Sequence, residues 1–185
     1  MRRQDLLRQE GWERRAKRVR LLLLDVDGVL TDGRIVLDEA GREFKFFNIK
    51  DGQGIKLLQQ AGLRVGILSG RRSPAVRLRA KELGIRLLRQ RVLDKGEALE
   101  AVLRKEKFRA EQICFVGDDL VDLPVFYRVG FAVAVADSVE DVKAKAHYIT
   151  RHPGGQGAVR EVCDLILKAQ GKWEAATKKY FQQLR

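Results

Sequence analysis

Apolar and polar positions follow two different rhythms along this chain, and the two rhythms alternate from Arg20 onward. Short apolar runs typical of buried strands occupy residues 20–26, 64–70, 85–89, 112–118 and 131–136. Apolar positions at helical spacing occupy residues 54–62, 73–84, 95–107, 122–130 and 158–170. Ser73 followed by Pro74 is a typical helix start. Strands that alternate with helices predict an α/β fold, with a mostly parallel sheet flanked by helices.

Residues 33–50 break this alternation and predict a small β-hairpin inserted after the first strand. Two short strands flank a turn at residues 39–41, and the second arm carries Phe44, Phe46 and Phe47. One face of a lone hairpin cannot hide three aromatic rings, and exposed aromatic surface commonly marks an interface. We therefore expect self-association; the alternative is that the rings pack on the parent domain.

The rest of the chain predicts one domain with two tails. A chain of 185 residues with 45% apolar content can bury one sizeable core. The expected parts are a basic N-terminal extension at 1–19, the α/β domain at 20–170 and a C-terminal tail at 171–185. The tail is expected to be either a loose extension or an arm that docks. The hairpin leaves no room for a large cap domain.

The net charge of +12 raises the possibility of nucleic-acid binding, so its distribution matters. Residues 1–20 hold eight arginines and lysines against three acidic residues, and residues 168–185 hold five against one. Most of the excess therefore lies at the two ends, and no aromatic residues alternate with the arginines as in a single-strand binding face. Nucleic-acid binding as the main function is disfavoured, and solvated basic ends are the simpler interpretation.

The cysteines and the N-terminal residues favour a cytoplasmic protein that does not contact membranes. Cys114 and Cys163 belong to an apolar run and a helical pattern, with no second cysteine at metal-ligand spacing. They are expected to be buried and reduced. The first 20 residues are charged throughout and lack the apolar region of a secretory signal. His147 and His152 lack partners at metal spacing and are expected to be structural or surface residues.

Polar residues follow the predicted strands where ligands of open parallel sheets collect. These residues are Asp25, Asp27, Ser69, Gly70, Asp118, Asp119 and Asp122, and Lys95 begins a predicted helix. Two carboxylates held together repel each other unless a cation or a shared proton relieves them. The pattern therefore favours either a phosphate pocket with Mg²⁺ and a nucleophilic carboxylate, or a plain ion-binding site.

The order DVDGVLTD, ILSGR, Lys95 and GDDLVD resembles the four motifs of the haloacid dehalogenase-like phosphatases. The resemblance covers residues 21–170 and implies a Rossmann-like fold. It also implies that Asp25 is the nucleophile and Asp27 the general acid and base. Ser69, Gly70 and Lys95 would hold the phosphate. Asp25, Asp118 and the main-chain carbonyl of Asp27 would bind Mg²⁺, with Asp119 and Asp122 as supporting residues.

Within this superfamily, the segments FNIKDGQGIKLL, VGDDLVDLPVF and GGQGAVREVCDLILKAQGKW resemble those of one group of enzymes. The resemblance implies a capless, Mg²⁺-dependent homotetramer that hydrolyses 3-deoxy-D-manno-octulosonate 8-phosphate through an aspartyl-phosphate during lipopolysaccharide sugar synthesis. The implied partner is a small sugar phosphate, with Arg71 meeting its phosphate or carboxylate; the alternative for Arg71 is a surface salt bridge. Residues 154–157, GGQG, would form an anion-binding nest or merely a turn. Alternatives are a phosphatase of a sialic-type 9-phosphate, or a noncatalytic assembly module.

Overall fold

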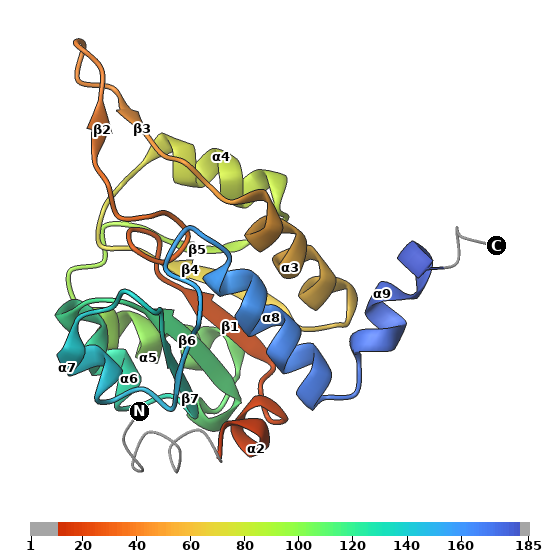
Figure 1. Cartoon of the computed structure of the whole chain (residues 1–185). Coiled ribbons are helices and arrows are strands. Elements are labelled where there is room, and N and C mark those ends of the chain that lie inside the picture. Colours follow the sequence, from red (N-terminus) through yellow and green to blue (C-terminus); the bar gives the residue numbers. More distant parts are fainter. Residues whose placement is uncertain (1–10, 182–185) are drawn as a thin grey trace.

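A parallel sheet forms the centre of the computed structural model, which describes residues 11–181 (Figure 1). The sheet has six strands in the order β5-β4-β1-β6-β7-β8, all paired in parallel. Its strands are β1 (Leu21–Leu24), β4 (Arg64–Leu68), β5 (Leu87–Arg89), β6 (Ile113–Gly117), β7 (Phe131–Ala134) and β8 (Tyr148–Ile149). The predicted α/β fold is thus confirmed, and the two-residue strand β8 was not predicted.

Helices cover both faces of the sheet. One face carries α2 (Trp12–Ala16), α3 (Ile49–Gln60), α4 (Pro74–Glu82) and α8 (Ala158–Ala169), and the other carries α5 (Lys95–Glu106), α6 (Leu123–Phe126) and α7 (Glu140–Lys143). Successive residues of a strand point to opposite faces, so Leu22 and Leu24 of β1 join the first core while Leu21 and Leu23 join the second. A strand buried on both faces is continuously apolar, which explains the run LLLL.

Two predicted helices differ in extent from the observed ones. α3 begins at Ile49 rather than at Gly54, because Asn48 caps it by accepting a hydrogen bond from Lys50 N at 2.8 Å. Gly52 and Gly54 hid this start, since glycine disfavours helices. The helix predicted at 122–130 is reduced to α6, which follows the short 3₁₀ helix Leu120–Asp122. A second 3₁₀ helix, Ala110–Gln112, precedes β6.

The inserted hairpin consists of β2 (Val36–Leu37) and β3 (Glu43–Phe44), paired antiparallel, and projects from the body of the molecule (Figure 1). Phe44 and Phe46 are 50% and 63% exposed. Phe47 instead packs against the core, with the Arg79 guanidinium 5.9 Å from its ring centroid. Of the three rings, one therefore packs on the parent domain and two remain exposed on this chain.

Both ends of the described chain pack on the domain. Ala16 and Val19 are buried, and their carbonyls accept hydrogen bonds from Gln170 Nε2 at 3.1 and 2.8 Å. In the C-terminal segment, α9 (Trp173–Phe181) lies beside α3, where Gln53 Nε2 donates to the Tyr180 hydroxyl at 2.6 Å. Of the two possibilities for this tail, docking is the observed one. Residues 1–10 and 182–185 of the predicted tails lie outside the described residues.

The predictions for the cysteines and histidines agree with the structure. Cys114 and Cys163 are buried free thiols. His147 Nδ1 accepts a hydrogen bond from Ala132 N at 2.9 Å, and His152 pairs with Glu161 at 2.7 Å, so both histidines have structural partners. Within residues 11–181, no helix combines the length and apolar character needed to cross a bilayer.

Candidate active site

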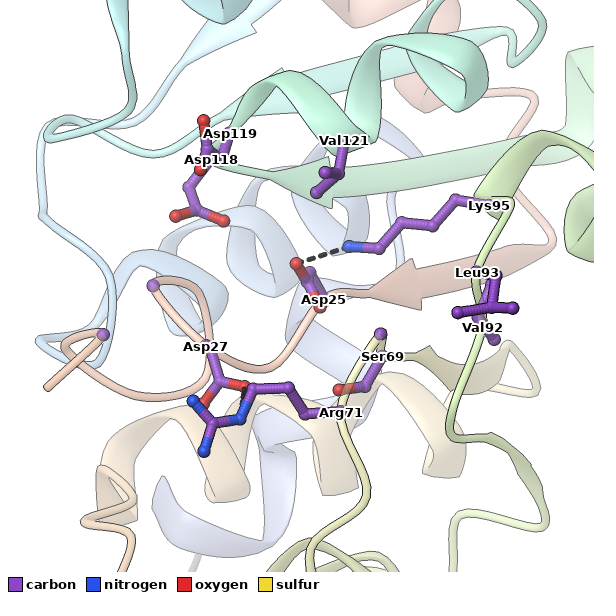
Figure 2. A pocket seen from close by; sticks show the side chains of 13 residues that line it. Asp25, Asp27, Ser69, Arg71, Val92, Leu93, Lys95, Asp118, Asp119 and Val121 are labelled. Atoms are coloured by element: carbon purple, nitrogen blue, oxygen red, sulfur yellow. Dashed lines mark hydrogen bonds and ion pairs between the residues drawn. The ribbon is translucent and has the colours of Figure 1, made fainter. Parts of the chain in front are cut away.

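A cleft of about 330 Å³ opens at the carboxyl ends of the central strands (Figure 2). The chain moves from β1 to β4 and β5 on one side and then to β6, β7 and β8 on the other, so β1 and β6 flank the topological switch point. The cleft is lined by Asp25, Asp27, Gly28, Gly33, Ser69, Gly70, Arg71, Val92, Leu93, Lys95, Asp118, Asp119 and Val121. All the predicted site residues except Asp122 therefore line one cavity.

Asp25 is fixed at the end of β1 by three hydrogen bonds. Its N–H donates to Val116 O at 3.0 Å, which continues the sheet pairing. Its Oδ1 accepts from Val26 N at 2.7 Å and its Oδ2 from Lys95 Nζ at 2.5 Å. Burial raises the pKa of Asp25 to about 6, with the charge of Asp122 adding to the rise and Lys95 opposing it. Asp25 is thus a well-ordered carboxylate directed into the cleft.

Lys95 is shared between two carboxylates. Its Nζ donates to Asp25 Oδ2 at 2.5 Å and to Asp122 Oδ1 at 2.6 Å, and its side chain is 4% exposed. The residue opens α5, whose cap Asp94 accepts from Glu97 N at 3.0 Å. Burial alone would lower the pKa of Lys95, but Asp25 and Asp122 outweigh it and raise the pKa. Lys95 therefore keeps its positive charge beside Asp25.

Asp122 organises the loop after β6 and lies beneath the cleft. It is fully buried, and its Oδ2 accepts hydrogen bonds from Asp118 N at 2.9 Å and Asp119 N at 3.3 Å. A Cβ on Gly117 would lie 2.5 Å from the same oxygen, so only glycine fits there. Asp122 therefore supports the site in two ways. Its Oδ2 fixes the backbone at Asp118, and its Oδ1 holds the Lys95 ammonium.

The carboxylates fit a hard cation. Among the described residues, oxygens of Asp25, Asp118 and Asp122 lie within 4.8 Å of one another. Asp122 is fully buried and does not line the cleft, whereas Asp25 and Asp118 do, so these two carboxylates are the ones open to a cation. Burial and the charges of Asp25 and Asp122 raise the pKa of Asp118 to about 8. A divalent cation would relieve this repulsion, and a set of oxygen donors suits Mg²⁺.

Gly28 makes room for the Asp118 carboxylate. A Cβ on Gly28 would lie 2.0 Å from Asp118 Oδ2, and the backbone there has φ +82°, which favours glycine. The glycine of DVDG is therefore required both by its turn and by Asp118, which follows β6.

Ser69 offers its hydroxyl to the cleft, whereas its amide is used within the sheet. It follows β4 and is 2% exposed, and its N–H donates to Arg89 O at 2.9 Å. Its carbonyl accepts from Val92 N at 3.1 Å, which ties the segment before Lys95 to β4. The Ser69 amide therefore completes the sheet edge, and the hydroxyl is the donor that this residue has left for the cleft.

Asp27 is held by Lys45, a residue that was not among those predicted from the sequence to form the site. Lys45 Nζ, from the hairpin arm, donates to Asp27 Oδ1 and also lies 3.3 Å from Glu43 Oε1. Arg71 donates to Glu43 Oε1 at 2.6 Å, and its Nε lies 3.9 Å from Asp27 Oδ2 (Figure 2). The available signal was the strand period, which places Lys45 opposite Phe44 and Phe46 and hence toward the domain.

The GGQG segment packs on the loop that follows Asp27. Gly155 N donates to Val29 O at 2.9 Å, and Gly154 N donates to Asp137 Oδ1 at 2.8 Å. A Cβ on Gly154 would lie 1.7 Å from Gly28 O. Of the two interpretations, a turn that supports the loop after β1 fits these contacts, because the amides of Gly154, Gly155 and Gln156 already have partners within the chain.

Comparisons with known proteins agree with this geometry. The family described as haloacid dehalogenase-like hydrolase matches residues 88–162. The 3-deoxy-D-manno-octulosonate 8-phosphate phosphatase KdsC of Yersinia pestis is 49% identical over 163 residues, covering 88% of this chain and 87% of that protein. The protein of the same name from Escherichia coli K12 is 46% identical over 162 residues, covering 88% and 86%.

A solved structure is also similar to this chain. It is the crystal structure of 3-deoxy-D-manno-octulosonate 8-phosphate phosphatase from Moraxella catarrhalis in complex with magnesium ion, phosphate ion and KDO. It has a TM-score of 0.90 and 40% identity, and the match covers 92% of this chain and 98% of that chain. The chain described here belongs to the family of 3-deoxy-D-manno-octulosonate 8-phosphate phosphatases within the haloacid dehalogenase-like hydrolases.

Proposed function

We propose that this protein is a Mg²⁺-dependent phosphatase that hydrolyses 3-deoxy-D-manno-octulosonate 8-phosphate to 3-deoxy-D-manno-octulosonate and phosphate. The observation that carries the proposal is the convergence of Asp25, Lys95 and Asp118 on one cleft. Relatives that share nearly half of their residues with this chain are 3-deoxy-D-manno-octulosonate 8-phosphate phosphatases, which supports the substrate. A plain ion-binding site would not need the buried lysine that touches Asp25.

In the first step, a carboxylate oxygen of Asp25 attacks the phosphorus. The bond between phosphorus and the sugar oxygen breaks as the aspartyl-phosphate bond forms, and Asp27 gives its proton to the departing sugar oxygen. Lys95 and the Ser69 hydroxyl hold the phosphate oxygens beside Asp25, together with the backbone at Gly70. Bound Mg²⁺, held by Asp25, Asp118 and the main-chain carbonyl of Asp27, would neutralise charge on the transferring group.

In the second step, water hydrolyses the aspartyl-phosphate. Asp27, now ionised, takes a proton from the water as the water oxygen bonds to phosphorus, and the bond to Asp25 breaks. Asp25 regains its carboxylate, and Asp27 regains the proton it gave up. Asp119 lines the cleft beside Asp118, and Asp122 keeps the loop in place for both steps.

Arg71 is the substrate-binding residue of this proposal. Its side chain is 46% exposed at the cleft and its guanidinium is paired with Glu43 rather than fully enclosed. A guanidinium in this position offers a planar pair of donors to the sugar carboxylate.

The proposal also includes a homotetramer that acts in the cytoplasm in lipopolysaccharide synthesis. The exposed rings of Phe44 and Phe46 support association through the hairpin.

Phosphate release from a panel of 2-keto sugar-acid phosphates, with and without Mg²⁺, tests the proposal. We expect the eight-carbon 8-phosphate to give the highest kcat/KM and chelation of Mg²⁺ to abolish release. Preference for a nine-carbon 9-phosphate would instead identify the sialic-type phosphatase. Absence of Mg²⁺-dependent hydrolysis of every ester would favour a noncatalytic assembly module.

A further inference from the structure

The hairpin has a second face that turns toward the cleft. Phe44 and Phe46 are at least half exposed, whereas the side chain of Lys45 between them is 2% exposed. Lysine is rarely buried unless it is paired. The burial of Lys45 therefore marks a specific contact rather than a solvated surface charge.

Lys45 belongs to a compact group of four charges that alternate in sign. Its ammonium donates to Asp27 Oδ1 and lies 3.3 Å from Glu43 Oε1. On the other side of Glu43, Arg71 donates to the same Oε1 at 2.6 Å. Two acceptors hold the ammonium at this place, so its position is fixed. Glu43 in turn fixes the arm that carries Lys45.

Asp27 depends on this contact for its orientation. The residue follows β1 on a loop, and its carboxylate is 27% exposed. Among residues 11–181, the side chains that pair with it are Lys45, through Oδ1, and Arg71, whose Nε lies 3.9 Å from Oδ2. Proton transfer requires the carboxylate within about 2.6–3.2 Å of the reacting oxygen. An aspartate without the Lys45 contact would spread over several rotamers.

We propose that Lys45 is a positioning residue that holds Asp27 for proton transfer to the leaving group. This inference rests on the proposed function, because it gives Lys45 a role only through Asp27. It also links the hairpin to proton transfer through Asp27, separately from any part in assembly. The Lys45 ammonium is buried against Asp27 and Glu43, and Lys45 is absent from the residues that line the cleft, so it does not bind substrate itself.

The test compares Lys45→Met, Lys45→Arg and a control, Lys50→Met, on two substrates. Lys50 is an exposed lysine five residues further along the chain, so its replacement removes the same charge without touching Asp27. The substrates are 3-deoxy-D-manno-octulosonate 8-phosphate, whose alkoxide needs a proton to leave, and p-nitrophenyl phosphate, whose nitrophenolate leaves without one. The readouts are kcat and KM for each substrate and the melting temperature of each variant.

We expect Lys45→Met to lower kcat/KM for the sugar phosphate by about 30-fold through kcat, because general acid catalysis contributes about 10²–10⁴-fold and a displaced acid keeps part of it. For p-nitrophenyl phosphate, kcat/KM falls less than about threefold, since phosphoenzyme formation needs no acid there. Lys45→Arg recovers part of the loss, and Lys50→Met behaves as the wild type.

Three results would overturn the inference while the proposed function stands. These are an unchanged Lys45→Met enzyme, a rise in KM for the sugar phosphate with kcat unchanged, and an equal loss on both substrates that follows the melting temperature. The second result would make Lys45 a substrate ligand, and the third a purely structural residue. A wild-type protein that hydrolyses only p-nitrophenyl phosphate would refute the sugar substrate. The Lys45 inference would then fall as well, because no substrate would show the predicted loss of kcat. Hydrolysis of neither ester would overturn both proposals.

Discussion

Replacing Gly28 with alanine should weaken Mg²⁺ binding and lower activity while the protein still folds. The added Cβ would lie 2.0 Å from Asp118 Oδ2, whereas ordinary contacts begin at 3.4 Å. The Asp118 carboxylate must therefore move by about 1.4 Å, the difference of these distances. Displacement of a catalytic group by about 1 Å can lower the rate by about 10²-fold. We expect Gly28→Ala to lower kcat/KM by about 100-fold or more, and to raise the Mg²⁺ concentration needed for half-maximal activity.

Gly62→Ala is the matched control for backbone strain. Gly62 has φ +84°, close to the +82° of Gly28, but nothing lies within 4 Å of its added Cβ. Each substitution places a side chain in the left-handed region, which costs about 1 kcal/mol of stability. We therefore expect the free energy of unfolding to fall by a similar amount in both variants, and activity to fall only in Gly28→Ala.

The assay is a Mg²⁺ titration of phosphate release, accompanied by denaturant unfolding of both variants. The reasoning would be refuted if Gly28→Ala kept wild-type kcat/KM and the wild-type Mg²⁺ requirement. It would equally be refuted if Gly62→Ala lost as much activity as Gly28→Ala, because strain alone would then explain the loss.

Three further predictions concern other parts of the molecule. Asp25→Asn should abolish turnover, to less than about 10⁻³ of wild type, while circular dichroism and the oligomeric state stay unchanged; activity near that of wild type would rule out Asp25 as the nucleophile. Replacing Phe44 and Phe46 together with serine should shift the protein toward smaller species in light scattering and lower turnover in parallel, and fully active monomers would break the proposed link between hairpin and cleft. Burial, with a contribution from Arg15, lowers the pKa of His147 to about 4; because the unfolded state then binds more protons below about pH 6.5, stability should be retained above that pH and decline as the pH falls toward 4. Between about pH 7 and about pH 5 the wild type should lose about 1 kcal/mol more than His147→Asn in denaturant unfolding, a value discounted for partial exposure, and equal losses would contradict the assignment.

The convergence of Asp25, Lys95 and Asp118 could be predicted because parallel strands end at one edge of a sheet. Each of these residues follows or precedes an apolar run whose length and flanks define an element. The register of single residues within the loops could not be predicted in this way. The contact between Asp122 and Lys95 depends on the conformation of the loop after β6. In that conformation one oxygen of Asp122 accepts from Lys95, far away in the sequence, and the other from the nearby amide of Asp118.

The segments near the two ends of the chain were harder to predict. Trp12 packs edge-on against Tyr148 at 5.8 Å between ring centroids, a contact across most of the sequence. The basic composition of the N-terminal residues hid the few apolar positions that make this contact. In the same way, the charged surface of α9 hid the small face, including buried Thr177, that rests on the domain. Local pattern identifies an amphipathic segment, but its partner depends on the whole fold.

The most direct test of the central claim is to trap the phosphoenzyme during turnover of 3-deoxy-D-manno-octulosonate 8-phosphate. Acid quenching followed by borohydride reduction converts an aspartyl-phosphate to homoserine, and mass spectrometry of the peptides locates it. The account predicts homoserine at position 25, dependent on substrate and Mg²⁺, and none in the peptide that contains Asp118. Active enzyme with no homoserine at position 25, or with homoserine at another aspartate, would contradict it.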